Sequence, residues 1–392
     1  MNRFTQADRM NRLPRQFFAD LAKKAFKAKG SGVDLINLGQ GNPDQPTPPH
    51  IVRKLQEAAD NPINHKYPPF HGYGYVKEAV ADFYQRQYNV KIDPNKEVAL
   101  LFGGKGGLVE LPQIYTQRGD VVLVPDPGYP DYWSGIALSG SEMVMMPLIE
   151  ENDFLPDYSQ LKSEDIERAK MMFLNYPNNP TGGAADQAFF DETVQFAKKN
   201  DIFVVHDFAY GAVGFDGVTP RSFLQSEGAK DVGIEIYTMS KSFNMAGWRI
   251  AFAVGNEEVI DAINTYQDHM YCSIFGAIQE AATVAFQYAE ESIPELNALY
   301  ERRHKTWMKA LHDIGWNAKP SKGSFFTWLP VPEGISSNAF AEELLEKVGV
   351  STAPGIGFGE HGEGYLRAAL LVEEARLEEA AERFATLPYF KK

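Results

Sequence analysis

The chain has 392 residues, of which 44% are hydrophobic and 23% charged, a composition typical of a folded globular protein large enough for two domains. Its formal net charge of −14 at pH 7 disfavours a nucleic-acid partner, because phosphate backbones are bound by basic surfaces. The lack of a membrane-length apolar run, of a secretory signal and of a second cysteine beside Cys272 predicts a cytoplasmic protein without disulfides.

Seven short apolar runs between residues 97 and 255 predict the strands of a largely parallel sheet. They alternate with segments of helical length, which is the pattern of crossover units in α/β proteins. In chain order the runs are EVALLF, DVVLVP, EMVMMPL, AKMMFLNYP, DIFVVHDF, EIYTMS and RIAFAV. The spacing of apolar residues predicts crossover helices over GLVELPQIYTQRG and DQAFFDETVQFAKKN.

The last part of the chain has a different character. A long charged helix is predicted from Glu291, followed by the strand signal SFFTWLPVP and the helix AFAEELLEKVG. We therefore expect a large α/β domain over residues 42–285 and a smaller α+β domain made of residues 1–41 and 286–392.

Polar residues that follow the apolar runs are the first candidates for a site, because ligands of open α/β sheets collect at the carboxyl ends of strands. Lys241 follows EIYTMS, where burial would lower the pKa of its amine and favour a Schiff-base nucleophile. Arg249 could hold a phosphate, together with the hydroxyl groups of Thr238 and Ser240. On this motif alone, a plain surface lysine is an equal alternative.

Two further runs end in side chains that could bind a ring. Asp207 ends DIFVVHDF, with Tyr210 shortly after it, and a buried carboxylate there needs a partner. A protonated pyridine nitrogen would suit, since the pair keeps the ring an electron sink, although an N-cap or a salt bridge is the alternative. Asn179 follows AKMMFLNYP, where its amide could donate to a phenolate oxygen or simply belong to a turn.

The remaining candidates lie in a glycine-rich turn, an aromatic turn and a late strand. Gly104 and Lys105 open a helix whose first N–H groups could receive a phosphate, but Gly106 excludes a nucleotide P-loop. Tyr129 could stack on a planar ring, although core packing is commoner. Arg367, in EGYLRAALL, would bind either a substrate carboxylate or a structural anion.

In their order and spacing, these motifs resemble class I aminotransferases of fold type I, from INLGQGNPDQPTP to GYLRAALL. The resemblance implies an α/β fold with a mostly parallel seven-stranded sheet and a smaller α+β domain. It also implies a cofactor, pyridoxal 5'-phosphate, and a homodimer with shared active sites. Such an enzyme transfers the α-amino group between an L-amino acid and a 2-oxo acid.

The roles that the resemblance implies fall on matching residues of this chain. Lys241 would hold the cofactor as an internal aldimine and shuttle a proton, while Asp207 would pair with the pyridine nitrogen. Tyr129 would stack on the ring, and Asn179 and Tyr210 would bond its phenolic oxygen. The phosphate would be held by Gly104, Lys105, Thr238, Ser240, Arg249 and, from the neighbouring subunit, Tyr67. The substrate carboxylate would bind Gly41, Asn179 and Arg367.

Three positions depart from the usual pattern of the family. Thr238 stands where Ser or Gly is usual and Ala251 where Gly is commoner, and neither change removes a required group. Gly104 replaces a serine of one subgroup's phosphate loop, so the phosphate would depend more on the charge of Lys105. The substrate side-chain pocket cannot be placed from sequence, and Phe17 and Phe18 are candidates for it.

Within the family, the motifs LFGGKGGLVELPQ, VHDFAYGAVGFDG and APGIGFGEHGEGY resemble those of bacillary methionine-salvage enzymes that aminate 4-methylthio-2-oxobutyrate. Alternatives are a transaminase of other neutral, aromatic or acidic amino acids, or a carbon-sulfur β-lyase on the same fold. A DNA-binding regulator is disfavoured, because the first family motif begins near residue 36 and the chain is acidic. We expect amino and oxo acids as substrates, with no metal, nucleic acid or membrane partner.

Overall fold

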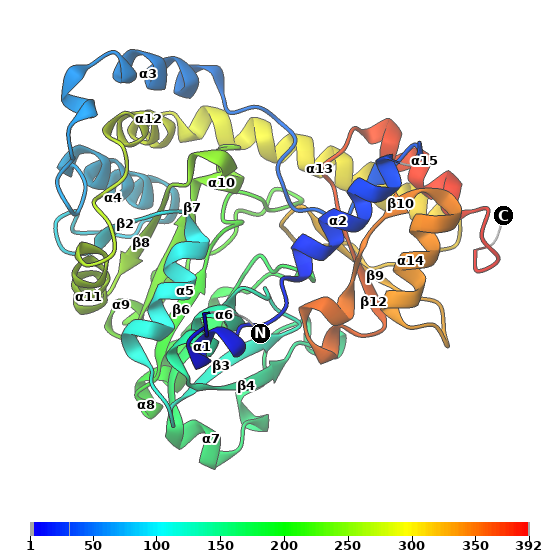
Figure 1. Ribbon diagram of the computed structural model, residues 1–392, viewed down its shortest axis with the longest axis horizontal. Coiled ribbons are helices and arrows are strands. Elements are labelled where there is room, and N and C mark those ends of the chain that lie inside the picture. Colours follow the sequence, from blue (N-terminus) through cyan, green and yellow to red (C-terminus); the bar gives the residue numbers. More distant parts are fainter. Residues whose placement is uncertain (1–3, 31, 391–392) are drawn as a thin grey trace.

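The computed structural model describes residues 4–30 and 32–390. A larger α/β part lies beside a smaller part, and helix α13 (Ala289–Asp313) extends from one into the other (Figure 1). Among the described residues, every helix is too short or too polar to cross a lipid bilayer.

A seven-stranded sheet forms the centre of the larger part, in the order β2-β8-β7-β6-β5-β3-β4. Neighbouring strands are parallel, except that β8 runs antiparallel to both β2 and β7. The strands are β2 (Val98–Leu101), β3 (Val121–Asp126), β4 (Glu142–Pro147), β5 (Ala169–Leu174), β6 (Phe203–Asp207), β7 (Gly233–Thr238) and β8 (Ala251–Gly255). The predicted mostly parallel seven-stranded sheet is therefore confirmed.

Helices cover both faces of this sheet, because successive side chains of each buried strand point to opposite faces. On β2, Ala99 and Leu101 belong to the apolar layer under α5 (Gly104–Tyr115), α6 (Tyr132–Ser139) and α11 (Glu257–Asp268). Val98 and Leu100 belong to the opposite layer, under α4 (Gly74–Tyr88), α8 (Gln187–Asn200) and α12 (Gly276–Gln287). The other helices of this part are α3 (Pro49–Ala59), α7 (Ser163–Arg168), α9 (Ala229–Val232) and α10 (Met239–Ser242).

The smaller part is built on a three-stranded antiparallel sheet in the order β11-β12-β9. Its strands are β9 (Phe326–Pro330), β11 (Ala353–Pro354) and β12 (Tyr365–Ala369), and its helices besides α13 are α14 (Ser337–Val348) and α15 (Glu374–Phe384). Strand β1 (Ile36–Asn37) pairs in parallel with β10 (Val350–Ser351), which attaches the N-terminal segment to this part. The predicted domain boundaries themselves stay a prediction.

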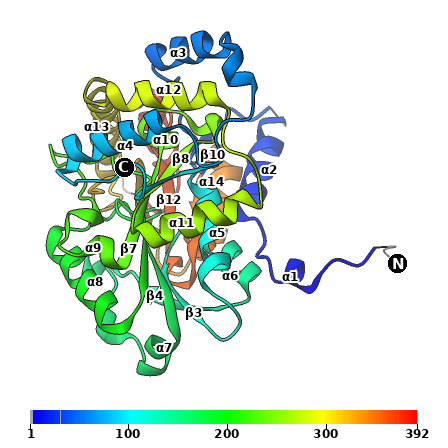
Figure 2. The ribbon, with the colours of Figure 1, turned by 90° about the vertical axis from the view of Figure 1, so that its left-hand side faces the viewer.

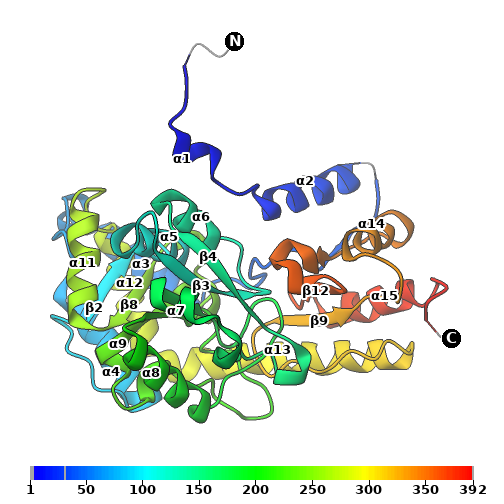
Figure 3. The ribbon, with the colours of Figure 1, turned by 90° about the horizontal axis from the view of Figure 1, so that it is seen from below.

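The N-terminal segment reaches across the molecule. Helix α1 (Asp8–Asn11) lies at the margin of the molecule near α6, whereas α2 (Phe17–Gly30) lies beside α14 (Figures 2 and 3). The first residues of α2, Phe17 and Phe18, pack on the ring of Phe358. Short 3₁₀ turns lie at Pro62–His65, Glu150–Asn152, Tyr158–Gln160, Phe223–Gln225, Ala246–Trp248, Gly355–Phe358 and Glu360–Gly362.

Two predicted strands end earlier than their apolar runs. The run EIYTMS is strand only up to Thr238, because the Thr238 hydroxyl accepts a hydrogen bond from the Ser240 N–H at 3.2 Å and caps helix α10. The run AKMMFLNYP is strand only up to Leu174. Asn175 then accepts the Asn179 N–H at 2.7 Å with its side-chain oxygen, which turns the chain. Both early endings place polar side chains at the carboxyl edge of the sheet.

Candidate active site

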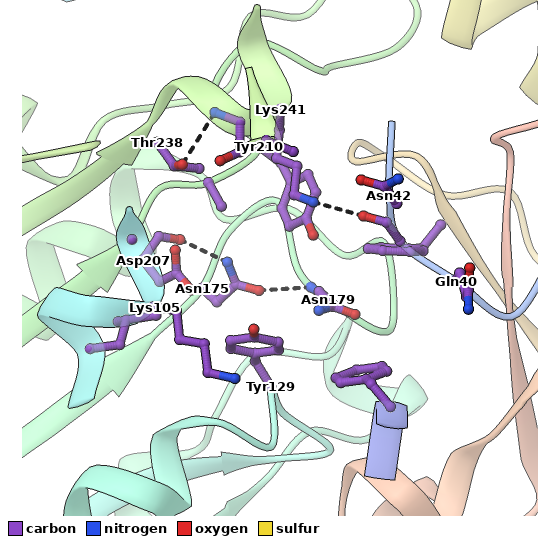
Figure 4. A pocket seen from close by; sticks show the side chains of 18 of the residues that line it. Gln40, Asn42, Lys105, Tyr129, Asn175, Asn179, Asp207, Tyr210, Thr238 and Lys241 are labelled. Carbon is purple, nitrogen blue, oxygen red and sulfur yellow. Dashed lines mark hydrogen bonds between the residues drawn. The ribbon is translucent and has the colours of Figure 1, made fainter. Parts of the chain in front are cut away.

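A cavity of about 370 Å³ lies at the carboxyl edge of the large sheet and is closed on its other side by residues of α2, β9 and β12. Every predicted site residue except Tyr67 lines it, namely Gly41, Gly104, Lys105, Tyr129, Asn179, Asp207, Tyr210, Thr238, Ser240, Lys241, Arg249 and Arg367. The fold thus brings together side chains that are far apart in the sequence (Figure 4).

Several residues that line the cavity were not predicted from the sequence, and one predicted site residue, Tyr67, lies outside it. The lining residues without a predicted role are Gln40, Asn42, Leu108, Asn175, Ala209, Ala246 and Phe326. Asn175 could have been found, because it belongs to the same asparagine-rich turn as Asn179. Of the two candidate pocket phenylalanines, Phe18 lines the cavity and Phe17 does not. Tyr67 lies outside it and is 87% exposed, so its contact with a neighbouring subunit stays a prediction.

Lys241 lies on the helical turn α10 that follows β7. Its Nζ donates a hydrogen bond to the Gly41 carbonyl oxygen at 2.7 Å (Figure 4). Burial, helped by the positive charges of Arg367 and Arg249, lowers the pKa of Lys241 to about 8, against the opposing effect of Asp207. A substantial fraction of the amine is therefore neutral near physiological pH, which is the state that forms a Schiff base.

Asp207 is the last residue of β6 and is buried. Its Oδ2 accepts a hydrogen bond from the hydroxyl of Tyr132, on α6, at 2.9 Å. Burial still raises the pKa of Asp207 to about 6, although the Tyr132 hydroxyl and the charge of His206 lower it. The ionised carboxylate is thus poorly compensated within the chain and would gain from a cationic ligand.

Asn175 fixes the geometry of two neighbouring strand ends. Its Nδ2 donates to the Asp207 carbonyl oxygen at 2.7 Å, and its Oδ1 accepts the Asn179 N–H at the same distance (Figure 4). Asn179 in turn accepts a hydrogen bond on its Oδ1, at 2.9 Å, from Nη1 of Arg367. A chain of amides therefore connects the Asp207 backbone to the arginine of the smaller part.

Arg367 lies on β12 with only 1% of its surface exposed. Nη2 donates to the Gly39 carbonyl oxygen at 2.9 Å, whereas Nε is buried without a partner among the described residues. Burial lowers the pKa of Arg367 to about 10. A buried donor without an acceptor is costly, so the arrangement fits an anionic ligand that arrives from the cavity.

Three aromatic rings surround the Arg367 guanidinium. Its central carbon lies 4.1 Å from the ring centroid of Phe326, 4.7 Å from that of Phe358 and 5.2 Å from that of Phe18. These rings come from β9, from the turn after β11 and from α2. They shield the cation from water, which strengthens any ion pair it makes with a ligand.

The other end of the cavity holds donors suited to a phosphate. Helix α5 begins at Gly104, and the first N–H groups of a helix lack partners within the helix. The Arg249 side chain lies close to Gly103, the residue before α5, since a Cβ on Gly103 would lie 2.3 Å from Nη2 of Arg249. The hydroxyl groups of Thr238 and Ser240 line the same cavity. Lys105 differs from expectation, because its Nζ pairs with the buried Asp131 at 2.9 Å and its charge is already compensated.

Comparison with known proteins identifies the family. Residues 33–384 match the family model of aminotransferase class I and II. The chain belongs to this family. It is 57% identical to the L-glutamine–4-(methylsulfanyl)-2-oxobutanoate aminotransferase of Bacillus subtilis, over 99% of this chain and 98% of that protein. It is 45% identical to an LL-diaminopimelate aminotransferase of Halothermothrix orenii, over 96% and 97% of the two chains. The substrate-bound structure of Bacillus subtilis BacF superposes with a TM-score of 0.95 at 46% identity, covering 99% of each chain.

Aminotransferases of class I and II depend on pyridoxal 5'-phosphate, and the cavity of this aminotransferase fits that cofactor. Cationic and hydroxyl donors that could bind the phosphate lie at one end of the cavity. The amine of Lys241 lines the cavity, where it could form the Schiff base, and the Asp207 carboxylate could pair with the ring nitrogen. The Asn179 Nδ2 and the Tyr210 hydroxyl line the cavity without a hydrogen-bond partner among the described residues. The expectations of a pyridoxal-phosphate aminotransferase with an α/β fold are confirmed.

Proposed function

We propose that this aminotransferase forms methionine from 4-methylthio-2-oxobutyrate and accepts L-glutamine as an amino donor. The proposal depends mainly on the 57% identity, over 99% of the chain, to the Bacillus subtilis enzyme named for these two substrates. The match covers the segments that build the cavity. It therefore favours a shared substrate class more strongly than the family membership alone.

The charges that line the cavity support a substrate with a neutral side chain. The charged lining residues are Lys105, Asp207, Lys241, Arg249 and Arg367, all at positions assigned to the cofactor or to the α-carboxylate. The lining residues of this chain that remain are apolar or uncharged. The far end of LL-diaminopimelate carries an ammonium and a carboxylate, and burying both without partners would be costly. The cavity thus favours a thioether or an amide over diaminopimelate.

We infer the following roles for the lining residues. Pyridoxal phosphate, when bound, supplies a ring that withdraws the electron pair left on the substrate α-carbon. Lys241 Nζ receives the proton from that carbon and later returns one, and a pKa of about 8 suits both transfers. Asp207 would hold a proton at the ring nitrogen, and Arg367 would orient the substrate carboxylate. Asn179 and Tyr210 would donate to the phenolic oxygen, and Tyr129 would cover the ring.

The phosphate is held, in this proposal, by the start of α5 and by the residues that face it: Gly104, Lys105, Thr238, Ser240 and Arg249. Because Asp131 already pairs with Lys105, Arg249 supplies most of the uncompensated charge. The backbone near Gly41 and the side chain of Asn179 lie beside the Arg367 guanidinium, and in this proposal they complete the carboxylate site.

We also propose a homodimer in which Tyr67 reaches the phosphate of the partner's site. Support comes from exposed apolar side chains on two neighbouring segments, namely Ile63, Tyr67 and Phe70 on the first and Met270 and Phe275 on the second. A hydrogen bond of 3.2 Å between His71 of the first segment and Asp268 of the second holds the two together. A surface of this kind favours burial against a second copy. The cytoplasmic location remains a prediction.

The division into residues 42–285 and residues 1–41 with 286–392 is likewise proposed. One apolar core of the large sheet includes Phe286 of α12 and Ala289 at the start of α13. The core of the smaller part instead receives Leu296, Tyr300 and Trp307 of α13. The change of core thus falls within the first turns of α13, a few residues after the proposed boundary at residue 286.

The proposed function is tested by the absorbance of the purified protein with pyridoxal phosphate, before and after methionine or glutamine is added. We expect a cofactor band in the wild type that either amino acid bleaches and that 4-methylthio-2-oxobutyrate restores. In Lys241→Ala, turnover should fall by at least about 10⁴-fold, because the variant lacks both the Schiff-base amine and the proton carrier. A Lys241→Ala protein with wild-type turnover would refute the site.

The same assay separates the substrate proposals. Bleaching by another amino acid, but by neither methionine nor glutamine, would contradict the salvage assignment and leave the aminotransferase class intact. Pyruvate release from cystathionine without an added oxo acid would favour the β-lyase reaction, because elimination needs no amino acceptor.

A further inference from the structure

Four side-chain amides line the cavity, and they fall into two pairs. Asn175 and Asn179 are engaged within the chain, since they bond the Asp207 backbone, each other and Arg367. Gln40 and Asn42 make no hydrogen bond to any described residue, although both line the same cavity. Their donors and acceptors are therefore available to a ligand.

The backbone that carries this free pair is held on both sides. The Gly39 carbonyl oxygen accepts from Arg367 Nη2 at 2.9 Å, and the Gly41 carbonyl oxygen accepts from Lys241 Nζ at 2.7 Å. The segment also lies close to β9, because a Cβ on Gly41 would come within 2.9 Å of Phe326. Gln40 and Asn42 are thus presented from a fixed segment rather than from a loose loop.

The pair lies away from the groups assigned to the cofactor phosphate and to the ring nitrogen. In Figure 4, Gln40 and Asn42 are on the opposite side of the view from Lys105 and Asp207. Both residues neighbour Gly41, next to the proposed carboxylate site of Arg367. A substrate bound there by its α-carboxylate could extend its side chain along this wall of the cavity.

We propose that Gln40 and Asn42 recognise the side-chain carboxamide of the amino donor. A carboxamide offers two donor hydrogens and an acceptor oxygen, and another amide complements both. This inference rests on the proposed function, in which glutamine is a donor and Arg367 binds the carboxylate. It adds the residues that select the side chain.

The rest of the wall explains how one cavity accepts a thioether as well. Phe18 and Phe326 line the cavity with the amide pair and offer apolar contacts. Neutral amides that stay partly exposed lose little when a methylthio group lies beside them, whereas a buried charge would lose its solvation. An uncharged polar pair on an aromatic wall therefore suits glutamine and methionine in turn.

The test compares Asn42→Leu, a change of similar size without hydrogen-bonding groups, with the wild-type holoenzyme. Asn42 is the sharper choice, because Gln40 also borders a groove along α2. The ligands are 4-carbamoylbutanoate and hexanoate, which correspond to glutamine and norleucine without the amino group and cannot react. Their dissociation constants are measured by calorimetry, beside kcat/KM for glutamine and methionine.

We expect Asn42→Leu to weaken 4-carbamoylbutanoate by about tenfold and to change hexanoate by less than about twofold, the loss of about one hydrogen bond. The value of kcat/KM should fall for glutamine and stay for methionine. Gln40→Leu should act in the same direction. Gln45→Leu is the matched control, because that half-buried amide lies in the same segment, bonds Asp44 at 2.7 Å and does not line the cavity.

Equal weakening of both ligands in Asn42→Leu would overturn the inference and leave Asn42 with a structural role. An unchanged affinity for 4-carbamoylbutanoate in both variants would overturn it as well. A wild-type enzyme that uses methionine but not glutamine would refute the carboxamide site while preserving transfer to the thioether oxo acid. The inference and the proposed function can thus fail separately.

Discussion

Two acidic side chains on neighbouring strands of the large sheet are buried in opposite ways. Glu235, on β7, is fully buried on the face away from the cavity. Its carboxylate accepts hydrogen bonds from His206 Nδ1 at 2.8 Å, the Ser222 hydroxyl at 2.7 Å, the Phe223 N–H at 2.6 Å and the Tyr84 hydroxyl at 3.1 Å. These five residues form the Glu235 cluster, in which the buried charge is compensated on every side.

Asp207 follows His206 on β6 and faces the cavity, and only the Tyr132 hydroxyl among the described side chains bonds its carboxylate. Burial accordingly raises the pKa of Asp207 to about 6. The Glu235 carboxylate therefore has hydrogen-bond donors on every side within the chain. The Asp207 carboxylate has few donors and would be stabilised by a positively charged ligand. Underpaired charge marks the functional side of the sheet, as expected where binding rather than folding supplies the missing partner.

Removing the saturated charge should have the largest effect on stability. Glu235→Leu leaves His206, the Ser222 hydroxyl and the Phe223 N–H without their acceptor in a buried layer. We expect the free energy of unfolding of the apoprotein to fall by about 3 to 5 kcal/mol, as measured by denaturant titration at pH 7. The affinity for pyridoxal phosphate of the protein that remains folded should change little, because the cluster does not line the cavity.

Glu235→Gln is the matched control for this prediction. The glutamine oxygen can take the place of Oε1, where it still accepts from the Phe223 N–H and from His206 Nδ1, and the amide nitrogen, in the place of Oε2, can donate to the Ser222 hydroxyl oxygen. A loss of about 1 to 2 kcal/mol is expected. If both variants were as stable as the wild type, the cluster would not be the stabilising counterpart of the site.

Asp207→Asn should have the opposite effect on the apoprotein. The pKa of Asp207 lies at about 6 in the fold and at 3.8 ordinarily, a difference of about two pH units that corresponds to about 3 kcal/mol. The wild type loses this stability as the pH rises from about 4 through about 6, because the folded state must give up a proton that the unfolded state has already lost. Asp207→Asn should therefore be about 3 kcal/mol more stable at pH 7 and no more stable near pH 3.

Pyridoxal phosphate should remove this advantage. A ring nitrogen that carries a proton compensates Asp207 in the holoprotein, whereas the neutral amide of the Asp207→Asn variant offers no charge, so the variant should bind the cofactor more weakly. Denaturant titrations with and without cofactor, each at pH 4, 5, 6 and 7, separate the two effects. An apoprotein variant with wild-type stability at every pH would show that Asp207 is compensated after all.

The sequence predicts the main residues of the site well and their hydrogen-bond partners poorly. Lys241 and Asp207 are found from their types and from their places at the ends of apolar runs, because parallel strands present their carboxyl ends at one edge. Arg367 is found because a guanidinium on an apolar strand needs an anion. The seven strands follow from the same runs. These features depend on local patterns and on one topological rule, so they need no knowledge of distant contacts.

The partners of these residues depend on long-range packing. Tyr132 reaches Asp207 from α6, 75 positions away in the chain, and reads in the sequence as another aromatic of a turn. Glu235 reads as an ordinary polar residue at the start of a strand, yet it joins side chains from three other segments. Gln40 and Asn42 carry no signal of their own, because neither follows a strand of the large sheet. A hydrogen bond of this kind becomes visible only when the layers are assembled.

Tyr132→Phe sharpens the comparison with the smallest expected effect. It removes the hydroxyl that, alone among the described side chains, donates to the Asp207 carboxylate, and it leaves the ring stacked on Phe173, whose centroid is 4.6 Å away. Without that donor the ionised carboxylate is less stable, so the pKa of Asp207 should rise by about one pH unit, or about 1 kcal/mol. The pH at which the apoprotein loses stability, measured relative to Asp207→Asn, should shift upward by the same amount. In the double variant Tyr132→Phe/Asp207→Asn the shift should vanish, since no titrating group remains. If Tyr132→Phe instead changed stability equally in both backgrounds, its hydroxyl would act on the fold and not on the carboxylate, and the underpaired state of Asp207 would need another cause.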